Sequence, residues 1–342
     1  MSSNICPECN QNSCEYRWCK SKHVHLLKSF WKCGNDKIDK LIQEAQLNAN
    51  YNWELIEWIS YDRNTFIYNG FTICKRWKSS RIFENYIDWK QKLRYLAELP
   101  SRLMRIHELD IVHRDFHPGN ILLSNFNDFM MISDFGLSKL IRANPNNLEK
   151  KNIFGVLPYI APEVLNEGEY TKAADVHSFG IIAYEIITGF PPYPDIPHDK
   201  DLAMKICNGL RPKIPFHIPK LITRTIMCWD ARITHRPTFK ELKNELCKYY
   251  KDYCHYLEEG KNNDSEIVIQ IKKPKDSQQI KNQPMQQLQL LLRNYQTHLQ
   301  AIYTSRLNFS KLPKPKNEEN FEKELEELAI SDLCPSNSDL FI

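Results

Sequence analysis

The stretch HRDFHPGN, from His113 to Asn120, decides what kind of domain this chain contains. It places a carboxylate, Asp115, five residues before an amide, Asn120. A carboxylate can accept the proton of an incoming hydroxyl group, and an amide oxygen is a neutral ligand for a hard cation. Downstream, Asp134 offers a second oxygen ligand, and Gly136 lets the backbone turn beside it. This pattern predicts a site where a metal-bound phosphate meets a hydroxyl group.

The residues around this stretch predict helices and short strands. Apolar residues recur every three or four positions from Trp89 to Ile106, which predicts a helix with one buried face. The segments IVHRDFHPGNILL and MMISDFG are expected to form a loop flanked by short strands. DVHSFGIIAYEIITG, from Asp175, is apolar through its middle and predicts a helix buried on all sides, ending at Gly189.

These segments resemble the protein kinases. HRDFHPGN is similar to their catalytic loop, and DFG and APE follow it in the family order. DVHSFG resembles the helix that braces the catalytic loop, which gives Asp175 that role. CWDARITHRP resembles the region before the last helix, which makes Arg236 the partner of Glu163. The DVxSFG and CW…RP forms are most similar to the tyrosine-kinase-like group.

The resemblance implies an α+β fold of the protein-kinase type, present mainly as the helical large lobe with a truncated small lobe. It also implies ATP and Mg²⁺ as cofactors and transfer of a phosphoryl group to a protein hydroxyl. The implied catalytic residues are His113, Arg114 and Asp115, the implied magnesium ligands are Asn120 and Asp134, and Leu122 is the implied floor beneath adenine.

The acceptor hydroxyl stays open between serine, threonine and tyrosine. His117 stands where serine/threonine kinases usually have lysine, and Val156 where they usually have threonine. Neither position is similar to the tyrosine kinases. The segment between Asp134 and Glu163 contains no threonine, which excludes a phosphothreonine switch there. Arg114 is therefore expected to make an ion pair or backbone hydrogen bonds.

The chain before His113 is too short for a complete small lobe. In kinases this lobe holds the nucleotide with a glycine-rich loop, a strand lysine and a helix glutamate. The similar loop here is YNGFTICKRWKSS, which contains the single glycine Gly70. Only 43 residues separate Gly70 from His113, and the predicted helix occupies much of that interval. Lys75 and Lys78 follow Gly70 too closely to lie on the next strand.

Three interpretations account for this shortfall. The chain is an active protein kinase, or a catalytically dead pseudokinase or interaction module that keeps the large lobe. In the third interpretation the sequence is an incomplete form of an active kinase. That form would lack a coding segment between Gly70 and Tyr86.

The N-terminal cysteines suggest a metal site. Cys6 and Cys9 form a CxxC pair, and Cys19 and His23 could complete a tetrahedral zinc site. The second pair has the spacing C-x3-H, which departs from a standard zinc ribbon. The alternative is a segment of reduced thiols.

The remaining properties bound the location and the organisation of the chain. The net charge of +4 gives no strong reason to expect nucleic acid, and no apolar run is long enough for a membrane helix. The first residues lack the apolar core of a secretory signal. We therefore expect a cytoplasmic protein with a protein substrate or partner, and with no nucleic-acid or membrane partner.

The expected parts are a cysteine-rich segment at 1–35, a degenerate small-lobe remnant at 36–85, the large lobe at 86–250, and a mostly disordered polar tail at 251–342 with one helix from Met285 to Tyr303.

Overall fold

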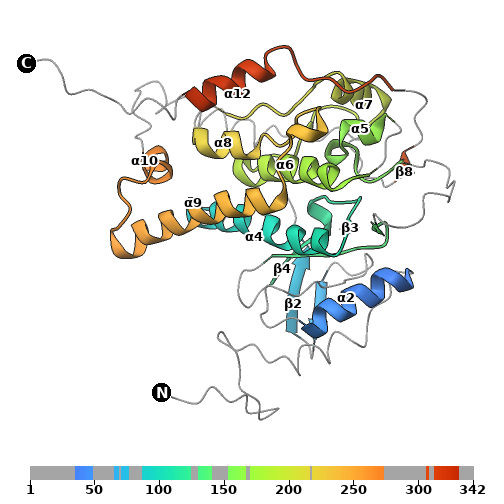
Figure 1. Cartoon of the computed structure of the whole chain (residues 1–342), viewed down its shortest axis with the longest axis horizontal. Helices are drawn as coiled ribbons and strands as arrows, with labels where there is room; N and C mark the ends of the chain where they lie inside the picture. The colour runs from blue at the N-terminus through green and yellow to red at the C-terminus, as the bar shows by residue number, and fades with distance from the viewer. Residues whose placement is uncertain are drawn as a thin grey trace, which may run out of the picture.

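A computed structural model describes the chain in separate ranges. They are 35–48, 65–68, 71–76, 87–124, 130–140, 153–166, 170–215, 218–272, 306–307 and 312–330. The cysteine-rich segment and the helix predicted from Met285 to Tyr303 lie outside these ranges. Within them, long helices stand beside a few short strands (Figure 1), so the predicted α+β architecture is confirmed. No helix of this described part is long and apolar enough to cross a membrane.

Three helices build the core: α4 (Trp89–Glu108), α6 (Lys172–Thr188) and α9 (Phe239–Glu259). Helix α4 packs along α9 and also contacts α6 (Figure 1). Its predicted apolar stripe is buried, because Leu93, Leu96, Leu99 and Leu103 are all 0% exposed. Helix α6 is buried on most sides, as its sequence predicts, and ends at Gly189 with the left-handed φ of 81°.

Helix α9 begins with a capping box. The backbone N–H of Glu241 donates to Thr238 Oγ1 at 3.3 Å, and the backbone N–H of Thr238 donates to Glu241 Oε2 at 2.7 Å. Replacing Thr238 with alanine is expected to lower the free energy of unfolding by about 1 kcal/mol, measured by urea denaturation. Thr238→Ser keeps the acceptor oxygen and is expected to remain near the parent. An equal loss in both variants would contradict the capping role.

Among the described residues, the strands form one larger sheet and two short ladders. The sheet has the order β1-β2-β4-β5, in which every neighbouring pair is antiparallel. Its strands are β1 (Thr65–Tyr68), β2 (Phe71–Arg76), β4 (Ile121–Ser124) and β5 (Met130–Ile132). Strand β2 pairs with β4 so that Arg76 lies opposite Leu122. The small-lobe remnant therefore joins the large lobe as part of one sheet.

The helix before this hairpin also joins the core. Helix α2 (Asp36–Asn48) is amphipathic, and its Ile38 and Ile42 are 0% and 3% exposed. Both side chains belong to the same hydrophobic cluster as the α4 stripe. The polar and aromatic region at 36–85 thus contributes to the domain core.

The remaining elements are β3 (Ile111–Val112), β6 (Lys139–Leu140), β7 (Ile153–Phe154), β8 (Arg306–Leu307), α5 (Pro162–Leu165), α7 (Lys200–Cys207), α8 (Lys220–Ile226), α10 (Glu266–Lys272), α12 (Phe321–Ile330) and the 3-10 turns η2 (Pro118–Asn120), η3 (Leu157–Tyr159) and η4 (Ile233–His235).

Beyond residue 250, the segments that the structure describes have more regular structure than their composition predicts. Helix α9 continues to Glu259, and α10 follows with Ile267 and Val268 buried. Residues 312–330 return to the large lobe and end in α12, and β8 pairs with β7. These segments thus have defined structure within a tail predicted to be mostly disordered, and the rest of that tail lies outside the described residues. Among the side chains of this segment that the structure describes, the buried apolar ones are the widely spaced Leu312 and Phe321, which form no periodic pattern.

Candidate active site

Asp175, in the first turn of α6, anchors the backbone of the catalytic loop by hydrogen bonds. Its carboxylate accepts the backbone N–H of His113 at 2.9 Å and that of Arg114 at 3.2 Å. His107 Nε2 lies 2.9 Å from the same carboxylate. Arg114 has the left-handed φ of 70°, which costs free energy for a residue with a long side chain. Asp175 therefore stabilises a strained backbone turn, the role that the resemblance implied.

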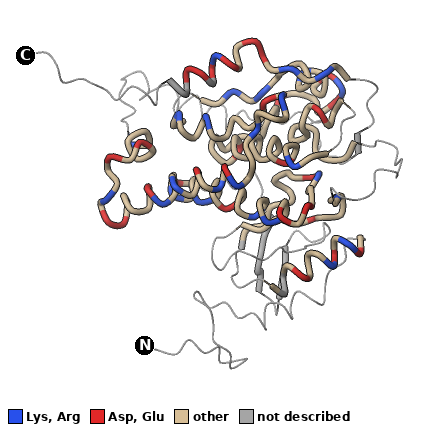
Figure 2. The backbone as a smooth tube through the Cα atoms, in the orientation of Figure 1, with Lys and Arg blue, Asp and Glu red and all other residues tan. Residues whose placement is uncertain are grey.

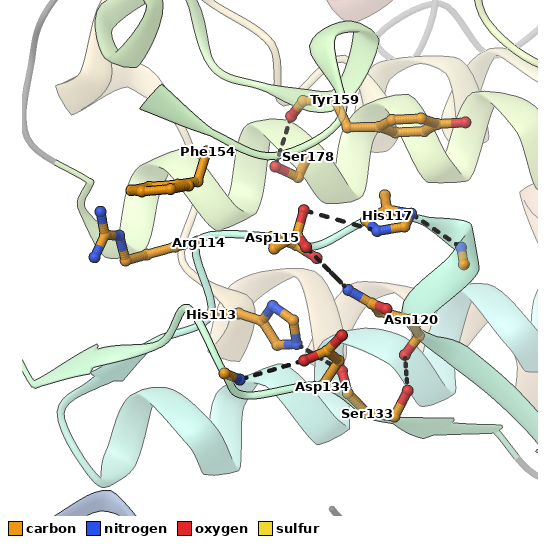
Figure 3. Close-up of polar contacts among 12 residues, drawn as sticks. His113, Arg114, Asp115, His117, Asn120, Ser133, Asp134, Phe154, Tyr159 and Ser178 are labelled. Carbon is orange, nitrogen blue, oxygen red and sulfur yellow. Dashed lines mark hydrogen bonds and ion pairs between the residues drawn. The ribbon is translucent and has the colours of Figure 1, made fainter. Parts of the chain in front are cut away.

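Asp115 is the central side chain of the loop, and it is only 8% exposed. Asn120 Nδ2 donates to the Asp115 carbonyl oxygen at 2.8 Å and lies 3.5 Å from carboxylate Oδ2 (Figure 3). On the other side, His117 Nε2 lies 3.7 Å from Asp115 Oδ1. Burial raises the pKa of Asp115 above its ordinary value, against the opposing effects of His113 and the Asn120 hydrogen bond.

The ring of His117 has a defined orientation. Its Nδ1 accepts the backbone N–H of Gly119 at 3.1 Å, so the proton of the neutral imidazole lies on Nε2 and faces Asp115. A Cβ at Gly119 would lie only 2.6 Å from Cε1 of that ring, so a larger residue there would displace the imidazole from this position. Sequence reasoning treated His117 only as a departure from the family pattern. The structure makes it a neighbour of the catalytic carboxylate.

Ser133 connects the two predicted magnesium ligands. The Asn120 carbonyl accepts the backbone N–H of Ser133 at 2.8 Å and its Oγ–H at 3.1 Å. His113 Nε2 donates to the Ser133 carbonyl at 3.0 Å. The next residue, Asp134, accepts the backbone N–H of Gly136 at 3.3 Å. The ends of β4 and β5 thus bring Asn120 and Asp134 to one side of Asp115 (Figure 3). Nothing in the sequence pattern singled out Ser133.

An amide and a carboxylate are donors that suit Mg²⁺, so this pair fits the expected metal. The residues expected near the nucleotide fit ATP binding less well than this pair fits magnesium. Leu122, the predicted adenine floor, is only 2% exposed and offers no open face in this conformation. Lys75 lies in β2, opposite Leu123 of β4, and Lys78 lies outside the described residues. In the part of the chain that the structure describes, the β1–β2 hairpin is the only strand pair before α4.

Arg114 has a different partner from the one expected. Its guanidinium lies over the ring of Tyr170, 4.5 Å from the centroid. The Tyr170 hydroxyl donates to the Phe154 carbonyl and accepts the Phe154 N–H at 3.0 Å. Burial raises the pKa of Tyr170 to about 12, so the ring stays neutral. Among the described residues, the side chain is thus held by an aromatic contact, and the expected ion pair or backbone hydrogen bonds stay a prediction.

The predicted pair of Glu163 and Arg236 is confirmed. Both guanidinium nitrogens Nη1 and Nη2 donate to the Glu163 carboxylate at 2.7 Å. The Arg236 side chain is 0% exposed, and its Nε donates to the Asp230 carbonyl at 2.7 Å. This bidentate pair ties α5 to the segment before α9.

The structure does not describe the predicted zinc ligands. Cys6, Cys9, Cys19 and His23 all lie outside the described residues. Among the residues that are described, no group of three or more histidine, cysteine or acidic side chains could hold a metal ion. Zinc binding at the N-terminus stays a prediction.

Comparison with known proteins now bears on the family. The family model described as protein tyrosine and serine/threonine kinase matches residues 16–246. The chain belongs to this protein kinase family. Membership implies ATP and Mg²⁺ as the cofactors that these kinases generally use. It also confirms the kinase-type fold expected from the five motifs.

Individual relatives include a serine/threonine-protein kinase and a growth factor receptor. A protein kinase and PP2C-like domain-containing protein of Arabidopsis thaliana is 29% identical over 279 residues, 68% of this kinase and 42% of the relative. Vascular endothelial growth factor receptor 3 of Danio rerio is 34% identical over 174 residues, 50% of this chain and 12% of the receptor. Serine/threonine-protein kinase VIK of Arabidopsis thaliana is 38% identical over 144 residues, 40% of this chain and 32% of that kinase. The chain spans less than half the length of each of these relatives.

Proposed function

We propose that this chain transfers the γ-phosphoryl group of ATP to a hydroxyl group of a protein. Asp115 accepts the hydroxyl proton, and Asn120 and Asp134 bind magnesium. The observation that supports this best is the hydrogen-bonded assembly through Ser133, which holds the base and both ligands in one frame. Bound magnesium would neutralise charge on the phosphates, and the chain's own residues position the hydroxyl.

Nucleotide binding can be tested without any assumption about turnover. Thermal unfolding of the full chain is measured with and without Mg·ATP. A ligand at about 100 times its dissociation constant stabilises a protein by ~2.7 kcal/mol, so the midpoint should rise. We expect the rise to vanish in Asp134→Ala and to persist in Glu108→Ala, which removes an exposed carboxylate of α4. An equal shift in both variants would contradict the assignment of Asp134.

Replacement of Asp115 with asparagine is expected to lower phosphoryl transfer by about 10²–10⁴-fold, because the amide cannot accept the proton. The Mg·ATP shift should remain. The free energy of unfolding should not fall, since the variant removes a buried carboxylate whose ionisation is disfavoured. The measurement is labelled-phosphate transfer to a generic protein substrate, with unfolding as control. Undiminished transfer would remove Asp115 from the base role.

The raised pKa of Asp115 also sets a pH dependence. The carboxylate is the base form, so transfer should fall as the pH drops through this raised pKa. The fall is expected at a higher pH than for an exposed aspartate.

A second candidate is a binding module that keeps the kinase large lobe without using ATP. The pairing of β2 with β4 and the burial of Leu122 favour it, because both leave little room for adenine. No Mg·ATP shift and no transfer would support this candidate. The third interpretation, an incomplete sequence, is tested on the transcript between Gly70 and Tyr86. An inserted segment encoding a lysine and a helix glutamate would establish it.

We also propose a cytoplasmic location, protein substrates or partners, and no nucleic-acid or membrane partner. The small net charge and the eleven cysteines, which suit a reducing compartment, support these proposals. Fractionation of cells that express the chain would test the location.

A further inference from the structure

Arg114 is the cation of the catalytic loop, and its side chain points away from Asp115 (Figure 3). Its backbone has the left-handed φ of 70° and is held by a hydrogen bond from the Arg114 N–H to Asp175 Oδ1 at 3.2 Å. The Nε atom of its guanidinium is buried and has no hydrogen-bond partner in the described part of the chain. A buried donor without an acceptor is costly, so a different kind of contact must hold this side chain.

That contact is made by Tyr170. The guanidinium carbon of Arg114 lies 4.5 Å from the centroid of the Tyr170 ring, which is a cation–π contact. The Tyr170 hydroxyl donates to the Phe154 carbonyl and accepts the Phe154 N–H at 3.0 Å. Tyr170 therefore joins the catalytic loop to β7, through its ring on one side and its hydroxyl group on the other.

The surroundings leave the Tyr170 ring little freedom. Arg114, Asp115, Tyr170 and Asp175 line a cavity of about 10 Å³, which holds no more than about one water molecule. The ring also packs against the hydrophobic cluster that contains Ile153. Because closely packed groups transmit strain, a shift of the ring would also move the loop that carries Asp115.

The segment beside Arg114 carries no charge of its own. A Cβ at Gly155 would lie 3.5 Å from the Arg114 carbonyl oxygen, so this segment lies against the loop. Between Ile153 and Pro162 the sequence has neither acidic nor basic residues, and Figure 2 draws this segment in tan. It therefore offers the guanidinium no carboxylate, and the aromatic ring is the contact that this side of the loop provides.

Phosphorylation does not offer an alternative partner within residues 134–163. A phosphate on a nearby hydroxyl group can order a loop by pairing with an arginine. The hydroxyl side chains in this range are those of Ser138 and Tyr159, which are 9% and 2% exposed. Ser138 Oγ donates to the His113 carbonyl at 3.3 Å, and the Tyr159 hydroxyl donates to Glu185 Oε2 at 2.7 Å. Neither group is open to a modifying enzyme in this structure.

We propose that Tyr170 is a positioning residue, which holds the catalytic loop in its working shape without phosphorylation of residues 134–163. Its ring keeps the Arg114 side chain in place, and its hydroxyl keeps the Phe154 backbone against the loop. The order of the loop is then a property of the folded chain alone. That this order supports phosphoryl transfer rests on the proposed function; the role of Tyr170 in ordering the loop does not.

The test compares Tyr170→Leu with Tyr170→Phe in the full chain. Leucine removes the ring and the hydroxyl group, whereas phenylalanine keeps the ring and removes only the hydroxyl. Tyr193→Leu is the matched control, because Tyr193 packs against the same hydrophobic cluster and its hydroxyl donates to the Leu210 carbonyl at 3.2 Å. Tyr193 does not line the cavity beside the loop. Thermal unfolding shows that all three variants fold.

Hydrogen exchange at the Arg114 amide is the first readout, since this N–H bonds to Asp175 and not to Tyr170. We expect exchange about tenfold faster in Tyr170→Leu than in the parent, and near the parent in Tyr170→Phe and Tyr193→Leu. Phosphatase treatment of the parent should leave the rate unchanged. Equal exchange in the parent and Tyr170→Leu, an equal rise in Tyr193→Leu, or faster exchange after phosphatase treatment would overturn the proposal.

Phosphoryl transfer is the second readout, with kcat and the KM for Mg·ATP measured separately. We expect kcat to fall about tenfold in Tyr170→Leu with little change in KM, because Tyr170 shares its cavity with Asp115. Tyr170→Phe should recover most of kcat, and the phosphatase-treated parent should keep it. An unchanged kcat in Tyr170→Leu would overturn the positioning role. A parent without transfer but with the expected exchange pattern would refute the proposed function and leave the ordering of the loop by Tyr170 in place.

Discussion

Replacing Arg236 with alanine is expected to cost the protein about 3–5 kcal/mol of its free energy of unfolding. The side chain is fully buried and forms two hydrogen bonds of 2.7 Å with Glu163. Alanine would leave that carboxylate in a largely buried site without its counter-charge, and it would also orphan the Asp230 carbonyl. Urea denaturation of the parent and the variant measures the loss.

Two further variants identify the source of this effect. Arg105→Ala removes a cation from an exposed pair with Glu108 and should cost less than about 1 kcal/mol. Combining Arg236→Met with Glu163→Leu removes both charges and should cost less than Arg236→Ala alone, because no buried charge is left unpaired. A loss below 1 kcal/mol for Arg236→Ala would contradict the view that this pair anchors the lobe.

Replacement of Asp175 with alanine is expected to have an effect of similar size, about 3–5 kcal/mol, for a different reason. Two buried donors from His107 and His113 and a partly buried one from Arg114 would lose their acceptor, and each orphaned buried group costs about 1–3 kcal/mol. The variant should also lose any transfer activity, since the strained turn at Arg114 is no longer held. Hydrogen exchange at the His113 and Arg114 amides measures the local effect, and urea denaturation the global one.

The local and global effects of Asp175→Ala should differ in extent. Exchange at these two amides should rise by more than exchange in the middle of helix α9, which lies outside this hydrogen-bond network. His107→Phe removes one of the three donors and should cost less than Asp175→Ala. Unaltered exchange at His113 and Arg114 would show that another group holds the loop.

Much of the large lobe could be predicted because its residues act through short-range patterns. The stripe from Leu93 to Leu103 has helical spacing, and Gly189 marks a helix end. The roles of Asp175 and Arg236 followed from motifs rather than from physics, since their partners lie far away in the sequence. The structure supplies the distances that justify both.

Other features have no sequence signal of this kind. Ser133 and Tyr170 act through contacts that depend on the loop conformation. The β1–β2 hairpin pairs with β4 through contacts between segments far apart in the sequence, and composition does not predict which strand edge it pairs with. The ordered segment 312–330 escaped prediction because its prolines and lysines are typical of disordered tails, while its buried apolar residues Leu312 and Phe321 are far apart.

The network around Ser133 has a consequence for how this chain evolves. Asn120 and His113 are 0% exposed, and their hydrogen bonds join the catalytic loop to the strand before Asp134. Substitutions at these positions would disrupt the packing of the lobe before they affected any reaction. Purifying selection on folding alone would therefore preserve them, even in a descendant that no longer uses ATP. Retention of Asn120 and His113 therefore reports on the fold, and the partly exposed Asp134 is the more sensitive record of retained activity.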